Sequence, residues 1–166
     1  MKTRTEKILV VLRILAFMGG IAYSIEWGSQ LTTLVASFIN PEWAKRTYEV
    51  NLNLFSIRDN STWYYVFAMC LNIAVSTLKA AIWFGIFALL TKLKLKTPFS
   101  MEVQKKLESI AYLLLAVWIV SSFFWDTYTY YLKQDTGIQL PANNSGGEYF
   151  FMAGIIYIIS QVFKRG

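Results

Sequence analysis

The sequence predicts an all-α integral membrane protein, a four-helix bundle whose chain crosses the bilayer four times. Hydrophobic residues make up 55% of its 166 residues and charged residues only 16%, whereas a soluble domain carries about 25% charged residues. The clearest span covers residues 64–91, in which Lys79 is the only charge from Tyr65 to Leu90. The hydrocarbon core is about 30 Å thick and a helix rises about 1.5 Å per residue, so this run is long enough to cross it.

Three further apolar segments are predicted to span the membrane, so that residues 1–166 form one four-span domain. Residues 8–27 follow a basic N-terminus but lack the cleavage pattern of a signal peptide, which favours a retained helix. Residues 108–128 begin amphipathic and end among aromatic side chains. Residues 149–163 are short for a span and are closed by a Lys-Arg pair.

The polar stretch between the first two spans, residues 28–62, is predicted to be a long first external loop. Residues 32–39 are moderately apolar and suit a short helix at the membrane interface. Residues 51–57 alternate apolar and polar side chains, which is typical of a short strand or another interfacial segment.

The distribution of basic residues predicts the orientation of the chain. Eleven lysines and arginines fall near the two termini and in the loop after residue 91, and four fall on the other side. The positive-inside rule therefore places both termini in the cytoplasm. Arg13, just inside the first span, is expected to extend its side chain to cytoplasmic headgroups.

Lys79 is the main candidate for a functional residue. It lies about 22 Å from either end of its span, and a charge at mid-bilayer costs about 2.5–3.5 kcal/mol, so it normally faces protein or water and has a partner. Asn72, Ser76 and Lys79 share one helix face. Two interpretations remain: a structural lysine paired inside the bundle, or a site for a proton, an anion or another ligand.

Two carboxylates lie near the outer ends of the predicted spans. Glu26 ends the first span and Asp126 ends the third. Either side chain could reach toward Lys79, and the alternative is that both are solvated charges at the outer interface. Their convergence with Lys79 in one pocket would favour a functional site.

Small residues on the first span predict a packing face. Gly20, Ser24 and Gly28 stand four residues apart, which places them on one side of the helix. Such faces allow a neighbouring membrane helix to approach closely.

The chain lacks the residues of common catalytic and metal sites. It has no histidine, and its single cysteine, Cys70, lies inside the second predicted span. Zinc sites, Cys-His pairs and Ser-His-Asp triads are thereby excluded. We expect no catalytic residues, no metal and no cofactor, and hence no enzyme. The net charge of +6 follows from the topology, so no nucleic-acid partner is expected.

A motif at the start of the third span carries a family resemblance. Thr97-Pro98-Phe99-Ser100 with Glu102, Leu107 and Ile110 resembles the signature of bacterial membrane proteins of the domain of unknown function 2975 family. The segment 155–166 is similar to that family's last helix. The resemblance implies a four-span protein of the bacterial cytoplasmic (inner) membrane with no assigned activity. Its members often stand beside genes for small helix-turn-helix regulators, which implies a partner in regulation. The motif also has a local explanation, because Pro98 ends one helix and Ser100 caps the next.

Taken together, these features predict a non-enzymatic membrane protein with a sensing, regulatory or accessory role. We expect it to act in the lipid bilayer as a homo-oligomer or with another membrane protein. The alternative is a small transporter or channel that uses the polar face of the second span around Lys79.

Overall fold

The computed structural model describes residues 4–47, 54–93, 100–140 and 146–165, and all regular secondary structure in these ranges is helical. The elements are α1 (Arg4–Ile39), α2 (Pro41–Thr47), α3 (Leu54–Asn60), α4 (Thr62–Lys92), α5 (Met101–Trp118), η1 (Ile119–Phe124), α6 (Trp125–Thr136) and α7 (Gly146–Arg165).

The first helix is much longer than the predicted span. Residues 32–39, expected to form a separate interfacial helix, continue α1 without a break. No proline interrupts this stretch, and the Thr32 hydroxyl donates to the Gly28 carbonyl 2.8 Å away within the same helix. The helix ends at Ile39, and Asn40 then caps α2 by accepting a hydrogen bond from the Trp43 amide at 3.1 Å.

The strand considered for residues 51–57 is wrong where the structure describes it. Residues 54–57 form the first turn of α3, while 51–53 lie outside the described residues. Leu54 and Ile57 are fully buried, and their spacing of three places both on one helix face. The short apolar and polar alternation could not distinguish this helical turn from a strand.

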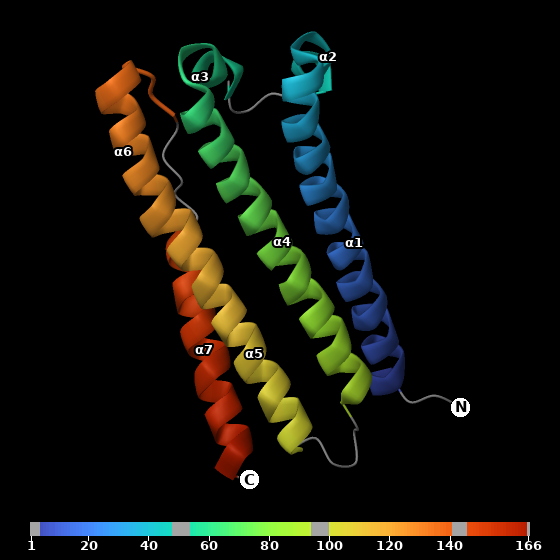
Figure 1. Cartoon of the computed structure of the whole chain (residues 1–166). Coiled ribbons are helices and arrows are strands. Elements are labelled where there is room, and N and C mark those ends of the chain that lie inside the picture. The colour runs from blue at the N-terminus through green and yellow to red at the C-terminus, as the bar shows by residue number, and fades with distance from the viewer. Residues whose placement is uncertain (1–3, 48–53, 94–99, 141–145, 166) are drawn as a thin grey trace.

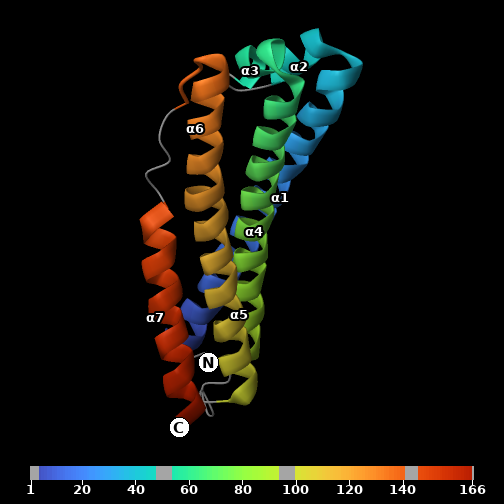
Figure 2. The same cartoon turned by 60° about the vertical axis from the view of Figure 1, so that its left-hand side comes forward.

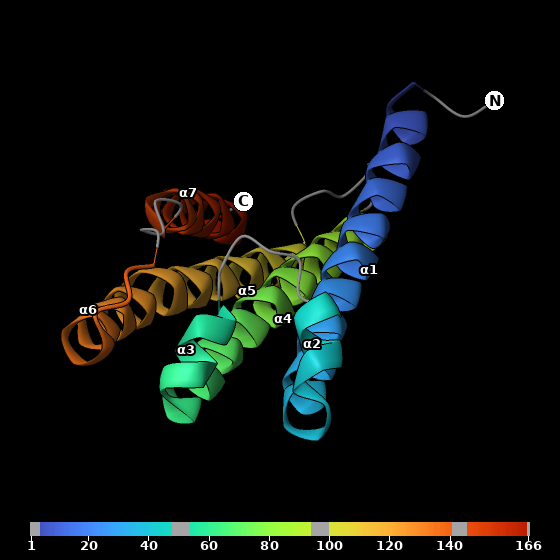
Figure 3. The same cartoon turned by 90° about the horizontal axis from the view of Figure 1, so that it is seen from above.

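The long helices are arranged as a row. α4 lies between α1 and α5, and α7 packs along α5 (Figure 1). Viewed from above, α7 lies beside α5 at one end of the row and α1 lies at the other (Figure 3). The start of α1, the end of α4, the start of α5 and the end of α7 all lie at the same level, at the bottom of the view in Figure 1.

Three helical stretches are long and apolar enough to cross a membrane. They are α1, α4 and the continuous stretch Met101–Thr136 that α5, η1 and α6 form. The six residues of η1 are π-helical, and the buried Ser121 hydroxyl donates to the Val117 carbonyl at 2.7 Å there. α7 has 20 residues and is not among these three stretches, so its role as a fourth span stays a prediction.

The long helices exceed the thickness of a bilayer core and carry a separate hydrophobic core at one end. α1 and the Met101–Thr136 stretch each have 36 residues, or about 54 Å of rise against a core of about 30 Å. Figure 2 shows α6, α4 and α1 extending well beyond the start of α7. Side chains of α3, α4 and α6 pack together in this extension: Leu54, Ile57, Tyr65, Ala68, Met69, Trp125, Tyr128 and Leu132. The candidate site lies on α1 and α4, between this extension and the end of α4.

Candidate functional site

A polar contact joins α1 to α4. The hydroxyl of Ser76, which is only 2% exposed, donates to Glu26 Oε1 at 2.9 Å and has a longer contact of 3.5 Å to Gln30 Oε1. The Gln30 amide in turn donates to Glu26 Oε1 at 3.4 Å. Glu26 and Gln30 are four residues apart and therefore neighbours on one helix face. The carboxylate of Glu26 belongs to an exposed residue, so this polar contact opens to the surface.

Lys79 lies one turn along α4 from Ser76 and is held by two aromatic rings. Its ammonium nitrogen is 5.6 Å from the ring centroid of Tyr23 on α1 and 5.8 Å from that of Tyr149 on α7. Both distances fall within the range of about 6 Å for cation–π attraction. Lys79 thereby connects α4 to two other helices.

The expected carboxylate partner of Lys79 is not found within the described ranges. None of their Asp or Glu oxygens lies within 4.0 Å of its ammonium group. Glu26 binds Ser76 instead, and Asp126 lies exposed in the first turn of α6. Three residues were predicted to converge. Glu26 contacts Ser76, and Lys79 lies one turn from Ser76 on α4, whereas Asp126 lies on α6 and is not part of this site.

Asn72 also lies apart from this group. Its amide donates to the Ala68 carbonyl of its own helix at 3.1 Å. Asn72, Ser76 and Lys79 lie on one face of α4 by their spacing, but the side-chain hydrogen bond of Asn72 is made within its own helix.

Sequence reasoning missed three members of the site: Tyr23, Gln30 and Tyr149. Tyr23, Glu26 and Gln30 follow a spacing of three and four residues, which places them on one face of a helix. This spacing could have predicted the shared face of Tyr23, Glu26 and Gln30. It does so only if the helix continues past Trp27, where the predicted span ends. Tyr149 is brought to Lys79 by the packing of α7, for which the sequence holds no local signal.

The small-residue face of α1 is shifted from the predicted one. A Cβ atom added at Gly20 would lie 2.6 Å from the Phe84 ring, and one added at Gly19 would lie 2.6 Å from the Trp83 ring. Ser24 donates to the Gly20 carbonyl at 2.8 Å. Gly28 has open space around the corresponding position. Close packing therefore uses Gly19 and Gly20, and Gly28 takes no part in it.

Aromatic rings pack across the contact of α1 with α4 between Lys79 and the start of α1, and two of them, Phe17 and Phe84, are partly exposed. Phe17 of α1 packs against Phe84 and Phe87 of α4, with ring centroids 6.3 and 5.4 Å apart. Together with Trp83 against Gly19, these rings form an aromatic layer. These rings lie between the polar contact and the start of α1.

Arg13 of α1 forms hydrogen bonds to the last turn of α4. Its Nε donates to the Leu90 carbonyl at 2.8 Å, and a second guanidinium nitrogen lies 3.5 Å from the Thr91 carbonyl. These carbonyls belong to the last turn of α4, which carries the negative end of the helix dipole. Arg13 therefore caps a neighbouring helix, and the extension of its side chain toward headgroups stays a prediction.

The family-like motif has a structural role where the structure describes it. The Ser100 hydroxyl accepts a hydrogen bond from the Val103 amide at 3.3 Å and so caps α5. Glu102, in the first turn of α5, forms an ion pair with Lys92 at the end of α4. Pro98 and Phe99 lie outside the described residues.

Within the part of the chain that the structure describes, no group of three or more His, Cys, Asp or Glu side chains could hold a metal ion. Comparison with family models, with curated proteins and with solved structures gives no match to this chain, so the resemblance to the domain of unknown function 2975 family stays a prediction.

Proposed function

We propose that this chain is a multi-pass membrane protein with a non-enzymatic sensing, regulatory or accessory role, exercised through helix contacts with a second copy or with another membrane protein. The observation that carries this proposal is the polar contact of Glu26, Gln30 and Ser76 beside Lys79. Polar side chains join membrane helices through hydrogen bonds between them. Because Glu26 remains exposed on α1, this face offers a binding surface to a further helix.

The positions of the basic residues support the predicted orientation. Lysines and arginines occur at the start of α1, the end of α4, the start of α5 and the end of α7, which all lie at the lower end of the helices in Figure 1. In this proposal that end faces the cytoplasm of a bacterial cell, and α7 is the fourth span of the helical bundle.

This placement changes the depth of Lys79. Lys79 lies 13 residues before Lys92 at the end of α4, or about 20 Å along the helix. Its side chain extends further toward Tyr149, in the first turn of α7. With Lys92 at the inner surface and a core of about 30 Å, the ammonium lies close to the outer interface rather than at mid-bilayer.

The transporter alternative has weaker support. A transport path between α1 and α4 would have to pass the aromatic layer formed by Phe17, Trp83, Phe84 and Phe87. Ala16, 1% exposed, directly precedes Phe17 of that layer on α1. In a Cys70→Ala background, we expect Ala16→Cys to resist a water-soluble thiol reagent, and rapid labelling would favour the transporter.

Cross-linking in native membranes tests the association. With Cys70→Ala as background, Ile25→Cys places a thiol beside Glu26 on the open face of α1, at a position 67% exposed. We expect oxidation to give a cross-linked dimer or a larger adduct, and Glu26→Gln to reduce its yield. Ile158→Cys on α7, 65% exposed, is the matched control and should stay monomeric. A monomer for both cysteines would contradict association through this face.

A further inference from the structure

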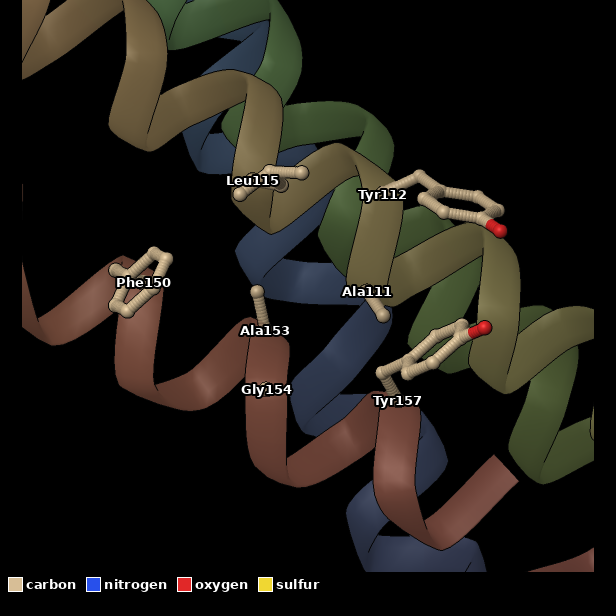
Figure 4. Close-up of a pocket in the computed structure, with 7 residues that line it drawn as sticks. All are labelled: Ala111, Tyr112, Leu115, Phe150, Ala153, Gly154 and Tyr157. Atoms are coloured by element: carbon tan, nitrogen blue, oxygen red, sulfur yellow. The ribbon is translucent and has the colours of Figure 1, made fainter. Parts of the chain in front are cut away.

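An apolar groove runs between α5 and α7, on the side of α5 away from α1 (Figure 4). Its volume is about 280 Å³, and its floor is made of small residues: Ala111 on α5, and Ala153 and Gly154 on α7. Gly154 leaves the groove open, because nothing lies within 4 Å of the point where a Cβ would stand.

Aromatic pairs bound the groove at both ends. Trp118 and Phe150 pack with ring centroids 4.9 Å apart at the end nearer the outer extension. Tyr112 and Tyr157 pack at the other end, 6.2 Å apart, and their hydroxyls point the same way (Figure 4). These two hydroxyls are the only polar side-chain atoms of the lining residues, so the groove is apolar with one polar end.

The size of the groove selects a slender occupant. Phe150 and Tyr157 are seven residues apart on α7, which is about 10 Å of rise, whereas a helix with its side chains is about 10–12 Å across. A second helix therefore does not fit between the aromatic pairs. A segment of a hydrocarbon chain does fit, with the rest of its molecule outside the groove.

Positive charge lies beyond the polar end on both helices. Lys105 precedes Tyr112 by seven residues and Lys164 follows Tyr157 by seven, so each lysine shares a helix face with its tyrosine about 10 Å away. Both lysines are exposed. Glu108, on the same face of α5, accepts a hydrogen bond of 3.5 Å from the Tyr112 hydroxyl. Lys106 adds a third positive charge, so the charge at this level remains positive.

We infer that the α5–α7 groove binds one acyl chain of an anionic phospholipid, whose phosphate is held by Lys105 and Lys164. The tyrosine hydroxyls lie between the apolar groove and the lysines, at the level of the ester groups of such a lipid. The lipid comes from the leaflet on the basic side of the protein. This inference rests on the membrane placement proposed above and adds a ligand to it.

Native mass spectrometry of the full chain in detergent, with added phosphatidylglycerol or phosphatidylcholine, tests the inference. We expect the unchanged chain to retain one phosphatidylglycerol in preference to phosphatidylcholine. Gly154→Leu places its Cβ in open space and the rest of its side chain in the groove, and it should abolish the bound lipid. Gly28→Leu, at a helical glycine with equally open surroundings on α1, should retain it.

The headgroup contacts are tested separately. Lys105→Gln with Lys164→Gln should weaken phosphatidylglycerol binding about tenfold or more and remove the preference over phosphatidylcholine, because each lysine near an anionic phosphate contributes about fivefold in affinity. An unchanged preference would show that the lysines do not bind the phosphate.

Other outcomes overturn the inference in distinct ways. Equal lipid retention by Gly154→Leu and the unchanged chain would exclude the groove as the site. A change in dimer fraction without loss of lipid would identify the groove as a protein interface. Carbonate extraction of membranes separates this from the proposed function: a chain that is extracted refutes the membrane placement itself, whereas one that stays in the membrane without binding phosphatidylglycerol refutes only the lipid site.

Discussion

At the scale of single residues, Lys79 is stabilised by aromatic rings from two helices, and no carboxylate of the described residues forms an ion pair with it. Its ammonium lies 5.6 Å from the Tyr23 ring centroid and 5.8 Å from that of Tyr149. Such contacts contribute about 0.5–2 kcal/mol, more when they are shielded from water. The residue therefore acts as a link between α1, α4 and α7, and its removal is expected to loosen α7 in particular.

A double-mutant cycle measures this link. We expect Tyr149→Leu to lower the free energy of unfolding, and to lower it less in a Lys79→Met background, with a coupling energy of about 0.5–2 kcal/mol. Tyr157→Leu, also on α7, contacts the Tyr112 ring and should show no coupling to Lys79→Met. Unfolding in denaturing detergent followed by circular dichroism gives the four free energies. A coupling of zero for Tyr149 would mean that the ring and the ammonium do not interact in the membrane.

At the scale of elements, the contact between α1 and α4 depends on two glycines. Gly19→Ala would place a Cβ 2.6 Å from the Trp83 indole, and overpacking of this kind costs about 1–3 kcal/mol. Both variants gain about 1 kcal/mol of helix propensity, and Gly28→Ala meets no neighbour, so the overpacking at Gly19 sets the difference. We therefore expect Gly19→Ala to be less stable than Gly28→Ala by about 1–3 kcal/mol, measured by thermal unfolding of both variants in one detergent. Equal stability would show that α1 can move away from α4 at no cost.

The end of α4 depends on a side chain from α1. Arg13 donates to the Leu90 carbonyl at 2.8 Å, and a hydrogen bond from a charged donor contributes about 1.5–3 kcal/mol. We expect Arg13→Gln to lose most of this stability and Arg13→Lys to lose less, because a lysine keeps the charge but not the planar set of donors. Hydrogen exchange at the amides of the last turn of α4 should accelerate in Arg13→Gln. Unchanged exchange there would indicate that water satisfies these carbonyls equally well.

At the scale of the whole molecule, the helical class and the three long apolar helices were predictable because apolar runs of this length have few alternatives. The position at which α1 ends was not predictable from the sequence. Polar residues after Trp27 were interpreted as a loop, but polarity reports the solvent around a helix and not its termination. Only Pro41, with Asn40 before it, marks a real boundary.

The candidate site was predictable only in part, for a related reason. Ser76 and Lys79 share a helix face by spacing alone, and Glu26 was close enough to be considered. The pairing of Ser76 with Glu26 depends on the register between α1 and α4, which the contacts of Gly19 and Gly20 with Trp83 and Phe84 set. Which rings surround Lys79 depends on the packing of α7, and no local pattern encodes that.

The number of spans is the property of the whole molecule that a single measurement can decide. α7 is not one of the three stretches that are long and apolar enough to cross a membrane by composition, yet it packs along α5 and its C-terminal end lies beside the basic start of α5 (Figure 1). A fourth span would return the C-terminus to the side of the N-terminus.

We therefore expect a green fluorescent protein fused after Arg165 to fluoresce in a bacterial host, because this protein becomes fluorescent only in the cytoplasm. The same fusion after Gly137 should remain dark. A fusion after Leu93 is the cytoplasmic control. If the fusion after Arg165 were dark and that after Leu93 bright, the chain would cross the membrane three times, α7 would lie on the outer side, and Lys105 and Lys164 could not hold one headgroup.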